Sequence, residues 1–237
     1  MFTAALKPKT CKLTKMPRIH FHQQLAQLKE KLLAMAALAQ QAVESSVEAY
    51  IQRDADLCEY VRQNEEAINA SQREVDEMAY ELLAKEQPMA IDLRFILAVI
   101  RINGDLERIG DQAMSTALRT LKLLQDPRTD LPVDILKMGN YASRMIRTSI
   151  HALLEGDVAR AESVRNMDDE IDHMNRLAHA DLIRVIQHRP DCAAQALQAI
   201  IISRNLERIA DHATNIATDV IFWIRGADLR HQLAAEE

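Results

Sequence analysis

Leu-Glu-Arg-Ile-Gly-Asp at residues 106–111 is repeated as Leu-Glu-Arg-Ile-Ala-Asp at residues 206–211, and this duplication decides the fold. The two hexapeptides agree at five of their six positions. Each lies inside a long stretch whose apolar residues recur every three or four positions, as in a helix. Matching motifs in matching surroundings indicate an internal repeat. We therefore expect two similar halves, each containing one copy of the motif.

The repeat extends to the segments that precede each hexapeptide. Val61 and Ile68 in the first half correspond to Val164 and Ile171 in the second at a separation of 103 residues, whereas the hexapeptides are 100 residues apart. A difference in the length of one loop explains this change. The correspondence therefore covers the second and third helices expected in each half.

The composition favours an all-α fold. Apolar residues make up 48% of the 237 residues and aromatic residues only 4%, and the chain has only five Gly and six Pro. Residues that favour helices, such as Leu, Ala, Gln, Glu and Arg, dominate, and no segment is typical of a strand. The sequence therefore predicts a helical bundle with a substantial core.

Six helical stretches are predicted between breaks at Pro88, residues 127–132, Gly156 and Pro190. Asp54 and Asp157 are expected to cap the second and fifth helices. Because short turns make neighbouring helices antiparallel, we predict two tandem, pseudo-symmetric three-helix bundles. The predicted divisions are a disordered basic tail at 1–19, a first bundle at 20–126 and a second bundle at 127–237.

Charge is distributed unevenly along the chain. The formal net charge is −6, yet the first 20 residues contain five basic residues and no acid, so the remainder carries −11. An acidic body argues against nucleic acid as a partner and suits cations or a basic protein surface. The longest uncharged runs have only twelve residues, which is too short to span a membrane. Three widely spaced cysteines predict neither a disulfide framework nor a zinc knuckle, and they suit a reducing compartment.

Each hexapeptide contains two carboxylates four residues apart, Glu107 with Asp111 and Glu207 with Asp211. On a helix these carboxylates share one face, and helical rotation points them away from the buried Leu and Ile of the motif. Like charges at this spacing repel each other, so a nearby cation is expected. The plain alternative is a solvated helix face, but its repetition in two places weakens that interpretation.

The preceding helices carry matching pairs, Glu65 with Asn69 and Asp168 with Asp172. If neighbouring helices bring these pairs together, each half presents several carboxylate or amide oxygens over a surface groove. Such hard donors suit Mg²⁺, Mn²⁺, Ca²⁺ or iron, and Zn²⁺ is also within their range. The predicted metal ligands are Glu65, Asn69, Glu107, Asp111, Asp168, Asp172, Glu207 and Asp211.

Further polar residues near the motifs have structural interpretations. Asp105 and its counterpart Asn205 lie near the edge of the apolar face and are expected to form interhelical hydrogen bonds. Arg108 and Arg208 are expected to form surface ion pairs, which contribute little stability. Gly104 and Gly110 lower helix propensity, so we expect them to permit close helix approach.

Histidines give only a weak indication of a site. His173 and His212, each just after an Asp, are expected to be solvated helix residues, and His179 is a possible ligand. Only Glu170 with His173 fits the Glu-x-x-His pattern of di-iron proteins, and the chain has no nucleophile elbow, phosphate-binding loop or dinucleotide fingerprint. A non-enzymatic regulator is therefore preferred. The alternatives are a metal-dependent hydrolase or oxidase that uses the same carboxylates, and a plain helical scaffold.

The first hexapeptide, preceded by Gln-Pro-Met-Ala-Ile-Asp-Leu-Arg at residues 87–94, resembles the PhoU family. The second, continued as His-Ala-Thr-Asn-Ile-Ala at residues 212–217, resembles the C-terminal motif of that family. The likeness covers about residues 20–230. The acidic motifs of the family fall on the eight predicted ligands, with an amide at Asn69 in place of a carboxylate. The surrounding motif residues are Asp92, Arg94, Asp105, Arg108 and Arg208.

This resemblance implies a function. Family members are cytoplasmic, homodimeric negative regulators of phosphate uptake and of the phosphate-starvation response. They act as adaptors between the ATPase subunit of the phosphate ABC transporter and a sensor histidine kinase in the membrane. Some bind clusters of iron or other metals on the acidic motif surface. The resemblance therefore implies a regulator rather than an enzyme.

Overall fold

The computed structural model describes residues 16–226, and most of the predicted basic tail lies outside this range. Within it the chain forms six α-helices, one short 3₁₀ turn and no strand, which confirms the all-α prediction. The helices are α1 (Met16–Gln52), α2 (Ala55–Glu86), α3 (Ile91–Leu123), α4 (Ile135–Glu155), α5 (Val158–His188) and α6 (Ala193–Arg225), with the 3₁₀ turn η1 (Pro190–Cys192) before α6. The first helix begins inside the segment predicted to be a tail.

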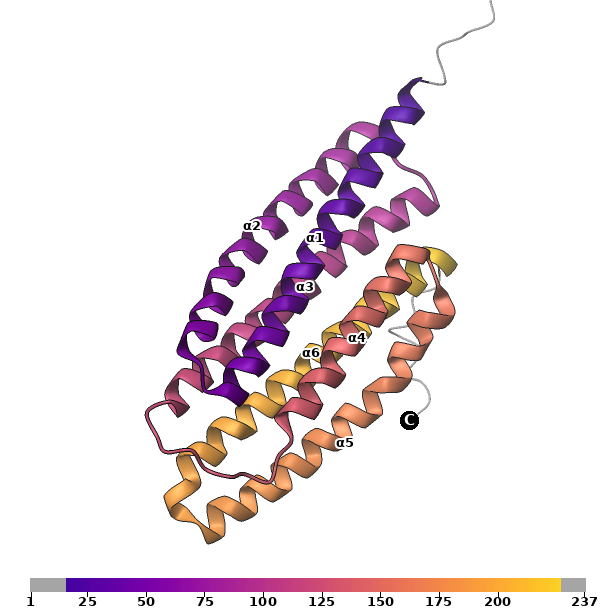
Figure 1. The fold of residues 1–237 in the computed structure, drawn as a ribbon. Helices are drawn as coiled ribbons and strands as arrows, with labels where there is room; N and C mark the ends of the chain where they lie inside the picture. The colour runs from indigo at the N-terminus through magenta and orange to yellow at the C-terminus, as the bar shows by residue number, and fades with distance from the viewer. Residues whose placement is uncertain (1–15, 227–237) are drawn as a thin grey trace, which may run out of the picture.

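Two three-helix groups lie side by side, α1–α3 in one and α4–α6 in the other (Figure 1). The most extensive helix contact is between α3 and α6, which join the two groups along the centre of the molecule, and α1 also contacts α4. The outer helix α2 packs on α1 and α3, while α5 packs on α4 and α6. The polar pairs of α2 and α5 therefore lie on helices that pack against α3 and α6, the helices that contain the two hexapeptides.

The helices α2, α4 and α5 begin or end at residues that the sequence predicted as caps or breaks. The Asp54 side chain accepts hydrogen bonds from the backbone N–H groups of Asp56 and Leu57, and Asp157 accepts one from Arg160, as predicted for N-caps. Gly156 ends α4 in the left-handed conformation (φ 64°), which glycine adopts without steric cost. These side chains satisfy backbone groups that the helices leave unpaired, so the turns are held tightly.

The core is continuous across the two groups, and the hexapeptides contribute to it directly. Leu106 and Ile109 in α3 are fully buried, as are Leu206 and Ile209 in α6. Burial of each such side chain contributes roughly 1.5–3 kcal/mol, so the rotation of both helices about their axes is strongly fixed. None of the helices among residues 16–226 is long and apolar enough to cross a membrane.

The close-approach prediction holds for Gly110 and is wrong for Gly104. A Cβ atom at Gly110 would lie 2.9 Å from Ile68 Cδ1 of α2, whereas nothing lies within 4 Å at Gly104. Gly139 of α4 is tighter still, because its Cβ would lie 2.5 Å from Val47 Cγ2 of α1. The contact between α1 and α4 therefore depends on a missing side chain.

Substituting alanine at Gly104 and at Gly139 should change stability in opposite directions. Gly104→Ala should raise the free energy of unfolding by about 1 kcal/mol, because alanine favours the helix and meets no neighbour. Gly139→Ala should lower it by about 1–3 kcal/mol, because Val47 has little rotamer freedom with which to make room. Urea unfolding of the two variants would measure both changes, and equal effects would contradict this packing at Gly139.

Candidate functional site

The second half brings the predicted ligands of α5 and α6 together. Carboxylate oxygens of Asp172, Glu207 and Asp211 all lie within 4.8 Å of one another. Asp168, one turn before Asp172 on α5, is close enough to Asp211 for the two charges to interact, and it accepts a hydrogen bond of 3.2 Å from the hydroxyl of Thr214. We call Asp168, Asp172, Glu207 and Asp211 the second acidic cluster.

Burial and mutual repulsion both disfavour the ionised form of this cluster. The pKa of Glu207 is raised first by burial and then by the charges of Asp211 and Asp172. The pKa values of Asp168 and Asp211 are raised for the same two reasons, in the same order. The folded chain therefore holds these carboxylates together at a cost, which a bound cation would relieve.

Cationic side chains do not neutralise the cluster. Among residues 19–226, neither Glu207 nor Asp211 forms an ion pair with Arg or Lys, whereas Asp172 forms one of 3.6 Å with the exposed guanidinium of Arg176. Arg208 lowers the pKa of Asp211 at longer range, but this effect is smaller than the effects of burial and of Asp172. The acidic surface predicted from the sequence therefore exists, and no internal Arg or Lys neutralises it.

The first half places Glu65 and Asn69 of α2 near Glu107 and Asp111 of α3. The pKa of Glu107 is raised by burial, then by Asp111, and more weakly by Glu65. The Asn69 amide donates a hydrogen bond of 2.5 Å to Glu65 Oε1 and so occupies one of the oxygens that could bind a cation. Among the described side chains, only the second half brings three acidic or histidine ligand atoms within reach of one ion.

The prediction that His212 is solvated was wrong. Its ring is only 8% exposed, and its Nδ1 lies 2.9 Å from Asp105 Oδ1 across the contact between α3 and α6. The amide of Asn215 also donates to Asp105, at 3.4 Å. The interhelical role predicted for Asp105 is thus confirmed, with a histidine as its main partner.

The pseudo-symmetric position in α6 makes the corresponding contact. The Asn205 amide donates to the hydroxyls of Ser115 and Thr116 in α3, at 3.1 and 3.2 Å. Its predicted interhelical role is therefore also confirmed. Two sets of polar contacts between α3 and α6, one at Asp105 and one at Asn205, therefore fix the register of this helix pair.

The remaining predicted residues lie in mixed surroundings. Arg108 and Arg208 are exposed and, among residues 19–226, form no ion pair, so that prediction was wrong for both. Arg94 Nε donates to the backbone carbonyl of Trp223 at 3.0 Å, which ties the start of α3 to the end of α6. Asp92 is half-buried beside the turn that precedes α3.

Apart from His212, no histidine among residues 19–226 lies with the acidic residues of either half. His173 is exposed, as predicted, and His179 is half-buried with an Nε2 atom that has no hydrogen-bond partner. The sequence reasoning missed Thr214, which donates to Asp168. Its position three residues after Asp211 places it on the same face of α6, which could have revealed it.

Two segments of the chain match the family model described as PhoU domain, residues 32–120 and residues 135–220. The phosphate-specific transport system accessory protein PhoU homolog of Pseudomonas putida is 35% identical over 212 residues, which cover 89% of this chain and 83% of that protein. A homolog of the same name from Caulobacter vibrioides is 32% identical over 213 residues, covering 90% and 93%.

Solved structures show the same architecture. The crystal structure of PhoU from Pseudomonas aeruginosa matches with a TM-score of 0.83 and 33% identity, covering 87% of this chain and 100% of that one. A PhoU structure from Streptococcus pneumoniae, at 24% identity, matches with a TM-score of 0.79, covering 88% and 98%, and supports the fold alone.

Neutralising the second acidic cluster should stabilise the metal-free protein. In the presence of a chelator, Glu207→Gln/Asp211→Asn should raise the free energy of unfolding at neutral pH by about 0.5 kcal/mol, because it removes like-charge repulsion. Both pKa values are raised in the folded state, so the folded protein binds more protons and the wild type loses stability as pH rises. The gain of the variant should therefore vanish below the ordinary carboxyl pKa.

Urea unfolding at several pH values would measure this dependence. The exposed acids Glu30 and Glu77 lie away from the cluster, and Glu30→Gln/Glu77→Gln is the matched control. A gain that is equal in both variants, or that grows toward acid pH, would contradict the clustered charges.

The buried contact between Asp105 and His212 should respond asymmetrically to substitution. His212→Ala should cost about 1–3 kcal/mol, because it leaves a buried carboxylate with only the long hydrogen bond from Asn215. Asp105→Asn should cost less than about 1 kcal/mol, because an amide oxygen can still accept from the ring. Denaturant unfolding compares the two, and a larger loss for Asp105→Asn would show that the charge itself is needed.

Proposed function

The chain belongs to the PhoU family, and from this we propose that it is a regulatory accessory protein of phosphate-specific transport. The relatives that it matches over most of their length carry the name of such an accessory protein. The two family-model matches contain the two hexapeptides, so the acidic motifs lie in the part of the chain that is shared. The detailed role rests on the duplicated acidic surface.

The observation that carries the proposal is that the carboxylates of α5 and α6 converge, and that Glu207 and Asp211 form no ion pair with Arg or Lys among residues 19–226. Asp172, Glu207 and Asp211 offer three carboxylates to one ion, and Asp168 lies beside them. Oxygen donors without a thiolate fit Fe, Mn, Mg, Ca or Zn. A cation bound there would neutralise the cluster and offer a positive centre to a partner.

The first half is the weaker candidate for a metal. Glu65, Glu107 and Asp111 remain available as carboxylates, but Asn69 brings an amide that already donates to Glu65. An amide lacks the negative charge that holds a hard cation. We therefore expect the second half to fill first.

These two surfaces would act by docking partners rather than by catalysis. Asp211 is exposed and the other three acids of the second acidic cluster are half-buried, so water reaches this surface. Catalytic electrostatics gain most of their strength in water-excluded sites. An open acidic surface is better suited to recognition, with affinity set by the presence or absence of the cation.

The proposed partners follow from the family. The chain would act in the cytoplasm as a homodimer and link the ATPase subunit of the phosphate ABC transporter to a sensor histidine kinase. In that role it would keep phosphate uptake and the phosphate-starvation response repressed when phosphate is plentiful. The acidic surfaces, open to solvent on both halves, are the faces proposed to meet these partners.

Neutralising the second cluster should release this repression. In phosphate-replete cells that carry Glu207→Gln/Asp211→Asn as the only copy, phosphate-starvation genes should be expressed, because the docking surface has lost both its charge and its cation. Glu107→Gln/Asp111→Asn should have a smaller effect. A transcriptional reporter measures both variants, with Glu30→Gln/Glu77→Gln as a control that should stay repressed.

Metal content separates the two parts of the proposal. Protein purified without chelators should contain metal by elemental analysis, and Glu207→Gln/Asp211→Asn should remove most of it. Normal repression by this variant would show that the second cluster does not carry the function. Derepression by a variant whose metal content is unchanged would show that charge matters and the cation does not.

A further inference from the structure

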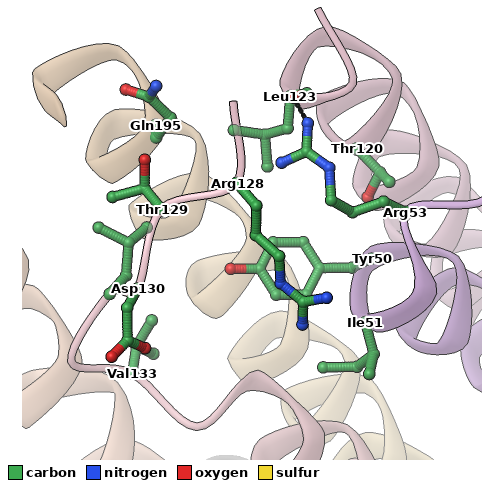
Figure 2. A pocket seen from close by; sticks show the side chains of 11 residues that line it. Tyr50, Ile51, Arg53, Thr120, Leu123, Arg128, Thr129, Asp130, Val133 and Gln195 are labelled. Carbon is green, nitrogen blue, oxygen red and sulfur yellow. Dashed lines mark hydrogen bonds between the residues drawn. The ribbon is translucent and has the colours of Figure 1, made fainter. Parts of the chain in front are cut away.

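A cavity of about 480 Å³ lies where the two halves of the chain are joined, away from both acidic clusters. Figure 2 shows its walls, which come from the end of α1, the end of α3, the segment that connects α3 to α4, and the start of α6. Three stretches that are distant in sequence, 50–53, 120–133 and Gln195, therefore meet around it. Its volume is in the range of sites for small organic ligands and exceeds what one inorganic ion needs.

The charge of this cavity is positive. Arg53 and Arg128 both line it, and among residues 19–226 neither forms an ion pair with a carboxylate. The one carboxylate on the lining, Asp130, is exposed. Both guanidinium groups act on the hydroxyl of Tyr50, where they oppose the rise in its pKa that burial causes. Both cationic groups therefore lie within electrostatic range of Tyr50 on the cavity wall.

One of the two arginines also has a structural role. Arg53 Nη2 donates to the backbone carbonyls of Leu123 and Asp126, the latter at 2.5 Å, and so closes the end of α3. Its remaining N–H groups are not used by these bonds, since a guanidinium has five donors. Arg128 is exposed and makes no such backbone contact, so its guanidinium can turn toward a ligand in the cavity.

A buried residue with an unpaired acceptor is part of the lining of the same cavity. Gln195, at the start of α6, is only 6% exposed, and its Oε1 has no hydrogen-bond partner. In Figure 2 the hydroxyl of Thr129 points toward Gln195. That hydroxyl has only a long contact of 3.5 Å, to the carbonyl of Pro127. A buried acceptor without a partner is costly, which is the state expected of a group that is completed by a ligand.

Apolar walls complete the cavity. The ring of Tyr50 and the side chains of Ile51, Leu123 and Val133 line it together with the polar groups. A bare oxyanion would leave these surfaces against water. The ligand must therefore have an organic part as well as an anionic one.

We propose that this cavity binds a small phosphate-bearing organic molecule of about nucleotide size. Its phosphate would meet Arg53 and Arg128, because guanidinium groups match phosphate oxygens in geometry and two of them suit a dianion. A hydroxyl or amino group of the ligand donates to Gln195 Oε1, and its organic part lies against the apolar wall. This inference does not depend on the acidic clusters or on the role proposed for them.

Calorimetric titration of the full chain with AMP and with glucose 6-phosphate tests the proposal. At least one of these probes should bind, and inorganic phosphate should compete with it, whereas adenosine or glucose should bind at least about tenfold more weakly. Arg128→Gln should weaken binding by about tenfold or more. Arg225→Gln, which removes an exposed arginine at the opposite end of α6 from Gln195, should leave it unchanged.

Gln195→Met separates ligand binding from a structural role. Methionine has a similar shape and no acceptor, so the ligand-free protein should be as stable as the wild type or more so, while affinity for the probe falls. A purely structural glutamine would instead give a loss of stability in the ligand-free protein. The proposal is overturned if neither phosphorylated probe binds, or if the bound probe has equal affinity for wild type, Arg128→Gln and Gln195→Met.

Discussion

The contact between α3 and α6 is the constraint on which the rest of the molecule depends. Leu106 and Ile109, with Leu206 and Ile209, are fully buried and fix how each helix is rotated. Once that rotation is set, the Glu and Asp of each hexapeptide must face the outer helices α2 and α5. The same rotation turns Asp105 toward His212. The core, the register of the two helices and the position of the acidic surface therefore all follow from the burial of the same Leu and Ile in both hexapeptides.

Much of this arrangement could be predicted because it is periodic or local. The apolar repeat predicted six helices, the short Asp side chains predicted the caps, and the four-residue spacing predicted shared faces. The burial of His212 could not be predicted, because it depends on which residue of α3 lies opposite, and a single helix gives no information on its partner. Gly104 was misjudged for the same reason, since an open neighbourhood and a crowded one look alike in sequence. The cavity could not be predicted either, because three stretches that are distant in sequence build it.

The two halves have the same arrangement of helices but different polar residues at matching positions. Asp172 of α5 stands where α2 has Asn69, and the amide turns toward Glu65 instead of adding negative charge. Asp105 stands where α6 has Asn205, and each has found different partners across the same helix pair. A duplicated fold keeps its buried Leu and Ile because both copies need them to pack. The polar positions between them are free to diverge, and among the described residues only the second half brings three carboxylates within 4.8 Å of one another.

The long separation between α3 and α6 also matters while the protein is being made. Residues 91–123 emerge from the ribosome well before residues 193–225 are made. The face of α3 that contacts α6 is therefore uncovered for roughly 5–20 seconds of translation. During that interval Asp105 lacks His212, and the apolar side chains beside it are covered only by what α1 and α2 provide. The nascent first half therefore leaves apolar surface of α3 uncovered until α6 arrives and completes the fold.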